Sequence, residues 1–198
     1  NVSFGNPIGG GDTVYLSVID AEGNACSFIN SLYSSFGTGL VVPGYGIALQ
    51  NRGSLFSLDL NHPNYLEPNK RPYHTIIPGM ATKNGELQLS FGVMGGFQQP
   101  QGHLQTLVNM IDFDLDPQKA LDGLRFRIDV EGDGTVHLEE GVSSKLVNEL
   151  SKKGHNINVV SGYDRVSFGG GQIISKDHSN GLLMGGTEPR KDGIAVGW

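Results

Sequence analysis

The residue types that most often carry catalysis are present in this chain, but most of their familiar arrangements are missing. The histidines show no paired spacing and Cys26 is the single cysteine, so the sequence offers no ligand set for structural zinc. Asp112, Asp114 and Asp116 begin like a calcium loop, but Pro117 stands where that loop needs a sharply turning glycine. We therefore expect a helix-capping turn there, and we predict no metal and no other cofactor.

Two other kinds of catalytic motif are also missing. The glycine triplets at 9–11 and 169–171 match neither familiar spacing of a phosphate-binding loop, and neither leads into a capped helix. The chain has no G-x-S-x-G sequence, so a hydrolase built on a Ser-His-Asp triad has no support.

What remains is an ordered set of short segments that combine hydroxyl groups, glycines and turn residues. In chain order they are Gly11-Asp12-Thr13, Ser17-Val18-Ile19-Asp20, Gly23-Asn24-Ala25, Phe36-Gly37-Thr38-Gly39, Pro68-Asn69-Lys70-Arg71-Pro72 and Phe91-Gly92-Val93-Met94-Gly95-Gly96. Each segment is a weak signal by itself, and Thr13 alone would be interpreted as the first residue of an alternating strand. Only the joint order of the segments favours a catalytic role.

Two hairpins in the first half of the chain must position these segments. Residues 13–20 and 25–30 are β-branched and aromatic runs separated by a turn, which predicts an antiparallel pair. The pattern recurs at 75–82 and 86–93, joined by a turn with the Asn-Gly sequence that suits a tight hairpin. Between the hairpins, residues 36–71 are rich in Gly, Pro and Asn, which predicts long ordered loops with only Ile47-Ala48-Leu49 strand-like.

The second half of the chain combines helices and short strands. Apolar residues at helical spacing predict a helix after Pro100, Asp116 and Pro117 predict the start of a second, and Ser143 that of a third. Short strands are expected around Val159, 166–168, 172–175 and 182–184. Strands grouped apart from helices predict an α+β layered fold with antiparallel sheets, in one domain.

The ordered segments together resemble the small subunit of the γ-glutamyltransferases, or γ-glutamyltranspeptidases, and in particular their divergent acylase-like branch. The resemblance implies the four-layer αββα sandwich of the N-terminal-nucleophile hydrolases. It also implies a precursor that cuts itself between Asp12 and Thr13, with residues 1–12 as the segment before the cut and residues 13–198 as the catalytic domain. The large N-terminal subunit of the same precursor would be its partner.

The resemblance also assigns the catalytic residues. Thr13 would be the nucleophile, and its α-amino group, with an ordinary pKa of about 7.7 to 8.0, would serve as its base after the cut. Ser31 falls where the family has a second hydroxyl hydrogen-bonded to the nucleophile. Gly95 and Gly96 fall on the glycine pair whose backbone N–H groups stabilise the tetrahedral oxyanion. An acyl ester on Thr13 would then be resolved by water or by an acceptor amine.

The positions that would hold the acyl group depart from the family pattern. Tyr33, Arg52 and Leu55 stand where glutathione-specific members bind the glutamyl amino group with an Asn, a Gln or Glu, and an Asp. His74 and Thr75 replace the paired serines that bind its carboxylate. Arg52 would repel an ammonium group and suits a carboxylate. A structural or surface ion pair is the alternative role of Arg52.

Three functions stay open on these grounds. The first is a γ-glutamyltransferase-like amide hydrolase or acyltransferase with a small-molecule substrate, such as glutathione or another γ-glutamyl compound. The second is a cephalosporin or glutaryl-type acylase. The third is an unprocessed, inactive family member with a binding or assembly role, because twelve residues precede Thr13 in the sequence.

Composition limits the partners and the location. The formal net charge is -6 and the densest basic run is Lys70-Arg71, which argues against nucleic acid as the main partner. No stretch approaches the roughly 18 consecutive apolar residues of a membrane span. Cys26 can form no internal disulfide, so cysteine usage does not fix the redox compartment. A cytoplasmic location is expected, and secretion would depend on the N-terminal part of the precursor.

Overall fold

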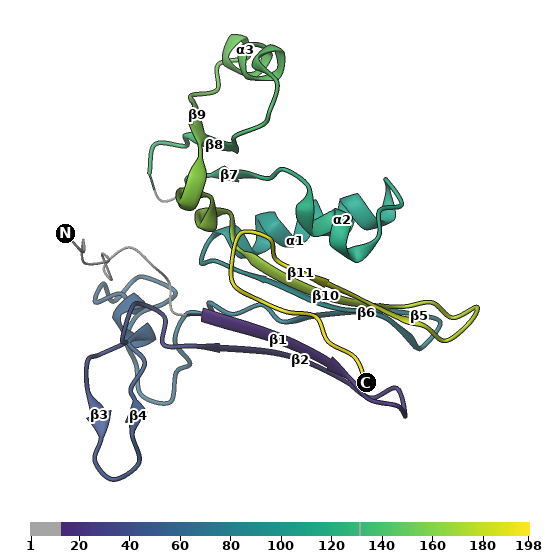
Figure 1. Cartoon of the computed structure of the whole chain (residues 1–198). Helices are drawn as coiled ribbons and strands as arrows, with labels where there is room; N and C mark the ends of the chain where they lie inside the picture. The colour runs from purple at the N-terminus through teal and green to yellow at the C-terminus, as the bar shows by residue number, and fades with distance from the viewer. Residues whose placement is uncertain (1–12, 131) are drawn as a thin grey trace, which may run out of the picture. The chain divides into compact units, whose positions relative to one another are not determined.

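The computed structural model describes residues 13–130 and 132–198 (Figure 1). The described chain divides into two compact units. The first contains residues 13, 14 and 30–76, and the second contains residues 15–29 with 77–130 and 132–198. The expected segment before the cut, including Asp12, lies outside the described residues.

The second unit is built on a four-stranded antiparallel sheet in the order β11-β10-β6-β5. The bounds of its strands are Gly79–Lys83 for β5, Glu86–Met94 for β6, Gly170–Lys176 for β10 and Leu183–Thr187 for β11. Asn84 and Gly85 join β5 to β6 with positive φ angles, as the Asn-Gly sequence predicts. The second hairpin is therefore confirmed, although its first strand begins at Gly79 and not at Thr75.

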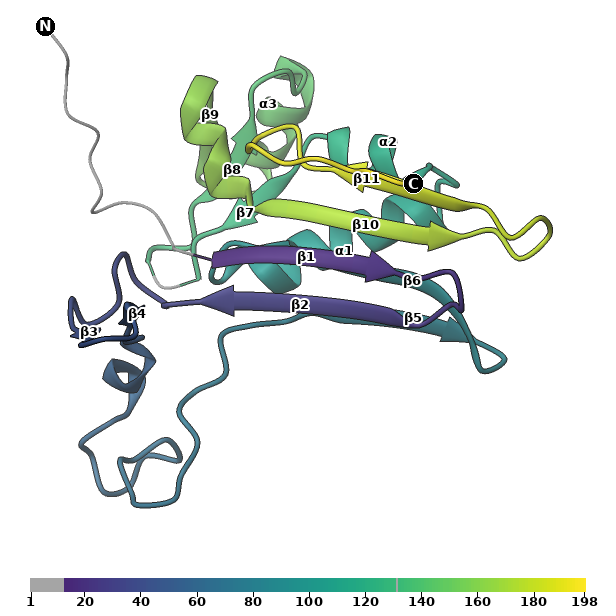
Figure 2. The same cartoon turned by 60° about the horizontal axis from the view of Figure 1, so that its bottom comes forward.

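One layer of secondary structure lies on each face of this sheet. The layers contain β1 (Thr13–Ile19) and β2 (Ala25–Ser31), and α1 (Gln98–Ile111) and α2 (Pro117–Asp122). Figures 1 and 2 show the helices on one face and the hairpin on the other. Alternate side chains of a strand point to opposite faces. Accordingly, Ser90 accepts a hydrogen bond from Ser17 of the hairpin at 2.6 Å, whereas Val93 packs against Gly102 of α1.

The hydrophobic core lies between the sheet and the helices. Leu89 and Phe91 of β6, Ile173 of β10 and Leu121 of α2 are buried in one cluster. Burying a side chain of this size stabilises the fold by about 1.5–3 kcal/mol. The helical layer is therefore held to the sheet mainly by apolar contact.

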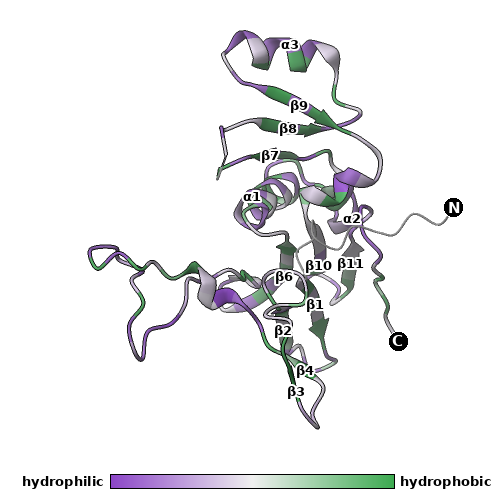
Figure 3. Cartoon of the chain, turned by 90° about the vertical axis from the view of Figure 1, so that its left-hand side faces the viewer, coloured by the Kyte–Doolittle hydropathy of each residue, from purple (hydrophilic) through white to green (hydrophobic). Residues whose placement is uncertain are grey.

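The second and third helices begin where the sequence predicts, whereas α1 begins at Gln98, before Pro100. The Asp116 carboxylate accepts a hydrogen bond from the Lys119 N–H at 2.8 Å, and Pro117 is the first residue of α2. The calcium-like triplet is thus a helix cap, as expected. The Ser143 hydroxyl accepts from the Leu146 N–H at 3.2 Å and caps α3 (Ser144–Lys152), which Figure 3 shows banded with hydrophilic and hydrophobic residues.

A second, three-stranded sheet was not fully anticipated. Its order is β7 (Phe126–Ile128), β8 (Val136–Glu139), β9 (Ile157–Val160), and β8 and β9 are parallel. Of these three strands, only β9 was located from the sequence. The strand expected at 166–168 is wrong, because this segment belongs to the 3-10 helix η3 (Gly162–Phe168). There Ser167 donates to the Asp164 carbonyl and Arg165 pairs with Glu139, contacts that favour a tight turn over an extended strand.

The first unit consists mostly of irregular backbone, as expected. It contains the short paired strands β3 (Val41–Val42) and β4 (Ile47–Ala48) and the 3-10 helix η2 (Arg52–Leu55). The α+β class with antiparallel pairing in the main sheet is confirmed by the described residues.

Candidate active site

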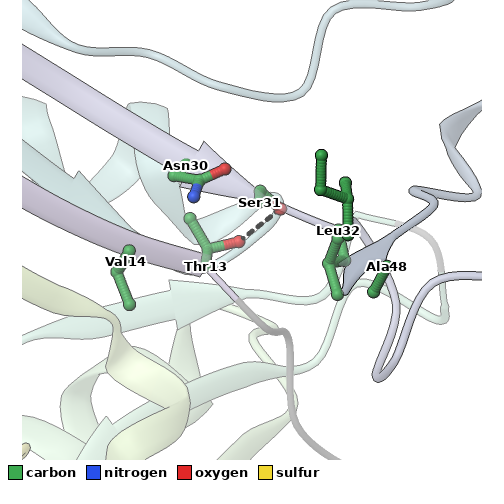
Figure 4. A pocket seen from close by; sticks show the side chains of 7 residues that line it. Thr13, Val14, Asn30, Ser31, Leu32 and Ala48 are labelled. Atoms are coloured by element: carbon green, nitrogen blue, oxygen red, sulfur yellow. Dashed lines mark hydrogen bonds between the residues drawn. The ribbon is translucent and has the colours of Figure 1, made fainter. Parts of the chain in front are cut away.

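The two hydroxyl groups assigned from sequence meet at the open end of the first hairpin. Thr13 is the first residue of β1 and Ser31 is the last of β2, so pairing of the two strands brings them opposite each other. Their Oγ1 and Oγ atoms are 2.8 Å apart (Figure 4). Both residues are partly exposed, so a substrate can reach this pair.

The hydroxyl pair lines an open pocket of about 570 Å³ in the first unit, a volume typical of small-molecule sites. Its other lining residues are Val14, Asn30, Leu32, Ile47 and Ala48 (Figure 4). None of these five residues was predicted from the sequence to belong to the site. The strand-like run at Ile47-Ala48 inside a long loop was the one signal that could have indicated them.

The backbone of Tyr33 forms a second hydrogen bond with the Ser31 hydroxyl. The Tyr33 N–H donates to the Ser31 hydroxyl oxygen at 2.9 Å. Tyr33 does so from the left-handed region, with a φ of 77°, which costs a non-glycine residue about 1–3 kcal/mol. A hydroxyl can accept and donate at the same time, so Ser31 can accept this bond and also donate its proton to Thr13 Oγ1.

Arg52 lies beside the same residues. Its Nε donates to Thr75 Oγ1, its Nη1 reaches Gln50 Oε1 at 3.3 Å, and its Nη2 reaches the Ser31 carbonyl oxygen at 3.5 Å. The guanidinium carbon is 5.9 Å from the centroid of the Tyr33 ring. The structure therefore brings Tyr33, Arg52 and Thr75 together at Ser31, and every group that contacts Arg52 here is neutral.

Two other positions compared with the family's acyl-binding residues do not join this group. His74 is exposed. Leu55 ends η2, and its carbonyl accepts a hydrogen bond from Asn64 Nδ2 at 2.8 Å. Neither residue lines the pocket at Thr13.

Gly95 and Gly96 belong to the second unit, where they connect β6 to α1. Their φ angles are 146° and 59°, and their carbonyls accept from the N–H groups of Gln98 and Gln99, each at 3.1 Å. Within residues 13–130 and 132–198, neither glycine N–H donates to a protein group. Both glycines are exposed, so their N–H groups can bind an external oxygen atom.

A buried histidine supports the strand that leads into this glycine pair. His103 Nε2 accepts a hydrogen bond from the Val93 N–H at 2.8 Å, which places its own proton on Nδ1. Burial lowers the pKa of His103 to about 4, so the ring is neutral at pH 7. No role for His103 was predicted from the sequence.

A buried network of charged side chains was also not predicted from the sequence. Two arginines and two glutamates of the second unit, each less than one-tenth exposed, form a charge network. Arg125 Nη1 lies 2.9 Å from Glu188 Oε2, Arg190 Nη1 lies 2.7 Å from Glu188 Oε1, and Arg190 Nη2 pairs with Glu139. The opposite charges balance, as burial requires.

No helix among the described residues is long and apolar enough to cross a membrane. In the same part of the chain, no three His, Cys, Asp or Glu side chains gather as metal ligands.

Comparison with known sequences gives a consistent result. The family model described as gamma-glutamyltranspeptidase matches residues 3–198. A glutathione hydrolase-like proenzyme of Bacillus subtilis is 42% identical over 194 residues, covering 95% of this chain and 36% of the relative. The oxamate amidohydrolase proenzyme of Klebsiella pneumoniae is 36% identical over 198 residues, covering 98% of this chain and 37% of the relative. The chain thus spans little more than a third of these relatives.

Solved structures agree with the sequence comparison. Cephalosporin acylase from Bacillus halodurans matches with a TM-score of 0.86 and 52% identity, over 93% of this chain and 34% of the acylase. A γ-glutamyltranspeptidase chain from Pseudomonas nitroreducens matches with a TM-score of 0.80 and 26% identity, over 93% of this chain and 98% of that one. These likenesses confirm the expected N-terminal-nucleophile hydrolase fold.

Proposed function

Because the chain belongs to the γ-glutamyltranspeptidase family, we propose that it is the catalytic part of an amide hydrolase or acyltransferase whose nucleophile is Thr13. The observation that carries the proposal is the 2.8 Å contact between Thr13 Oγ1 and Ser31 Oγ in an open pocket. A nucleophilic hydroxyl needs a neighbouring donor and room for a substrate, and this pair has both.

The hydrogen bonds around Ser31 suit this role. Tyr33 donates to Ser31, and Ser31 can then donate to Thr13, which stabilises negative charge on the attacking oxygen. The proton of Thr13 itself must leave to a base. The α-amino group released by a cut between Asp12 and Thr13 would be that base, with an ordinary pKa of about 7.7 to 8.0.

The proposed reaction has two halves. Thr13 Oγ1 attacks the amide carbonyl and its proton passes to the α-amino group. The N–H groups of Gly95 and Gly96 stabilise the resulting oxyanion. The C–N bond then breaks, the leaving amine takes the proton, and an acyl ester stays on Thr13. Water or a second amine attacks the ester in the same way and frees Thr13.

We further propose that the acyl group carries a carboxylate that binds Arg52. Arg52 contacts only neutral groups among the described residues, and guanidinium pairs with carboxylate through two parallel hydrogen bonds. Tyr33 offers an aromatic face beside it. Related proteins named glutathione hydrolase-like, oxamate amidohydrolase and cephalosporin acylase support this class of reaction without fixing the acyl group.

We propose as partner a large subunit cut from the same precursor. Relatives named as proenzymes, and the third or so of their length that this chain spans, support that arrangement. An intact-mass measurement of the full-length protein tests the first step. We expect two chains separated between Asp12 and Thr13 in the wild type, and one uncut chain in Thr13→Ala. A wild-type bond that stays uncut under all conditions would favour the inactive binding or assembly role.

The substrate is tested with p-nitroanilides of γ-glutamyl and glutaryl groups. We expect Arg52→Gln to raise the KM for the glutaryl compound by about 10-fold or more, because a charge-assisted pair is lost. Arg52→Lys is the matched control, because it keeps the positive charge and removes the planar guanidinium. Its KM for the glutaryl compound should lie between those of the wild type and Arg52→Gln. Equal KM values in all three proteins would remove Arg52 from the binding site.

A further inference from the structure

Gly95, in the glycine pair that follows β6, lies against a third glycine from a distant part of the chain. A methyl group added to Gly95 would lie 3.0 Å from the Cα atom of Gly169. A methyl group added to Gly169 would lie 2.7 Å from the Met94 carbonyl oxygen and 2.8 Å from Val93 Cγ1. Only glycine at position 169 permits this approach, and its φ of 87° also favours glycine.

The backbone at Gly169 is itself held by buried charges. Arg125 Nη1 donates to the Phe168 carbonyl at 3.1 Å and lies 3.4 Å from the Gly169 carbonyl. Glu188 pairs with Arg125 at 2.9 Å and accepts from the Gly171 N–H at 2.7 Å. This pair therefore fixes the segment 168–171 on both sides of Gly169.

The segment 168–171 also lies in register with β6. Gly170 pairs with Met94 and Gly171 pairs with Val93 in the sheet. A change in the position of this segment would thus be passed directly to the residues just before Gly95. His103 holds the same stretch of β6 from its helical side, through the Val93 N–H.

We propose that Gly169, with the Arg125–Glu188 pair behind it, is a positioning element for the oxyanion-binding N–H groups of Gly95 and Gly96. The inference rests on the proposed function, because it takes these N–H groups as the oxyanion donors. Such donors must lie about 2.7–3.1 Å from the developing oxyanion, and a misplacement of about 1 Å can cost about 100-fold in rate. This positioning element should therefore stabilise the transition state and leave the affinity for the substrate unchanged.

The test compares two alanine variants of the full-length protein, with rates normalised to the cut form by intact mass. Gly169→Ala places its methyl group against the Met94 carbonyl, whereas Gly181→Ala has a φ of 77° and no atom within 4 Å. Both carry the strain of a left-handed alanine, but only the first displaces β6. We expect Gly169→Ala to lower kcat by about 10- to 100-fold with KM within about twofold, and Gly181→Ala to change neither by more than about twofold.

A second readout separates positioning from general damage. A boronic acid analogue of the acyl group forms a tetrahedral adduct on Thr13, so its Ki should rise in Gly169→Ala by the same factor as kcat falls. If Gly169→Ala matches Gly181→Ala in kcat, or raises KM alone, the inference is wrong. If Thr13→Ala still hydrolyses the substrate, the proposed function itself is wrong.

If Gly169→Ala accumulates poorly or stays uncut, Arg125→Lys is tested in its place. Lysine keeps a positive charge beside Glu188, but its single nitrogen cannot replace both Nη1, which donates to the Phe168 carbonyl, and Nη2, which donates to the Leu121 carbonyl. We expect a fall in kcat of about 10-fold at unchanged KM. An unchanged kcat in this variant would overturn the inference.

Discussion

Protonation of His103 should destabilise the junction between β6 and α1 in mild acid. The ring is 8% exposed, and its Nε2 accepts from the Val93 N–H at 2.8 Å, so the protonated ring loses both its hydrogen bond and its solvation. Its pKa falls from an ordinary 6.5 to about 4 in the folded protein. Between these values the unfolded chain binds the proton and the folded chain does not, so the free energy of unfolding decreases as the pH falls.

The size of the effect follows from the two pKa values. One pKa unit corresponds to about 1.4 kcal/mol, so the full contribution over this window is about 3 kcal/mol. At pH 7 almost all of it is present. At pH 5 the unfolded histidine is mostly protonated, and about 2 kcal/mol is lost. With a urea slope of about 2 kcal/mol per molar, the unfolding midpoint moves down by about 1 M.

Urea unfolding at pH 7 and pH 5, in the wild type and in His103→Gln, measures this contribution. Glutamine can still accept from the Val93 N–H but does not titrate, so every other acid effect is common to both proteins. We expect the midpoint of the wild type to fall by about 1 M more than that of the variant. The same pH dependence in both proteins would refute a buried, neutral His103, and an NMR titration midpoint for His103 near 6.5 would refute it independently.

Three further outcomes follow from the described contacts. Ser31→Ala should lower kcat by about 10- to 100-fold, because Thr13 loses its hydroxyl partner at 2.8 Å, and Ser31→Thr should retain most activity in the p-nitroanilide assay. Leu121→Ala should lower the free energy of unfolding by about 2–5 kcal/mol in urea, because the side chain is fully buried in the core. Glu139→Gln should cost about 3–5 kcal/mol in the same measurement, because it leaves Arg190 buried with one charge partner fewer, and a loss below 1 kcal/mol would contradict this.

The elements that were correctly predicted are those defined by local signals. Alternation and a turn sequence locate the hairpins, because a strand that buries one face must alternate. Asp116 and Ser143 mark helix starts because their side chains can satisfy the first N–H groups without help from elsewhere. Each of these signals is contained within a few residues.

The elements that were missed depend on partners far away in sequence. Strand β7 pairs with β8 on one edge, and on its other edge Gln101 and Gln105 of α1 hydrogen-bond the backbone of Ile128 and Phe126. No local sequence pattern predicts a contact between helix side chains and the edge of a strand. The segment 162–168 has strand-like residues, but the pairing of Arg165 with Glu139, 26 positions away, holds it in a turn.

The residues of the candidate site also fall into two groups, those that could be predicted from the sequence and those that could not. Thr13 and Ser31 could be assigned through the family resemblance, and the predicted hairpin accounts for their contact, because it brings the ends of its two strands together. The left-handed Tyr33 could not, because nothing about a tyrosine indicates a φ of 77°. Nor could the contact between Gly95 and Gly169, since it joins residues 74 positions apart through backbone atoms alone.

The charge of Arg52 bears on which acyl group the site prefers. A glutaryl group and a γ-glutamyl group both carry a carboxylate, so attraction to the guanidinium does not distinguish them. They differ by an ammonium on the carbon next to that carboxylate. At about 4 Å, its repulsion by Arg52 is worth about 1 kcal/mol in water and about 4 kcal/mol in a partly buried pocket, a preference between about fivefold and about a thousandfold for the glutaryl group. Arg52 contacts only neutral groups in the first unit, so an acidic residue that offset this preference would have to come from outside the contacts described.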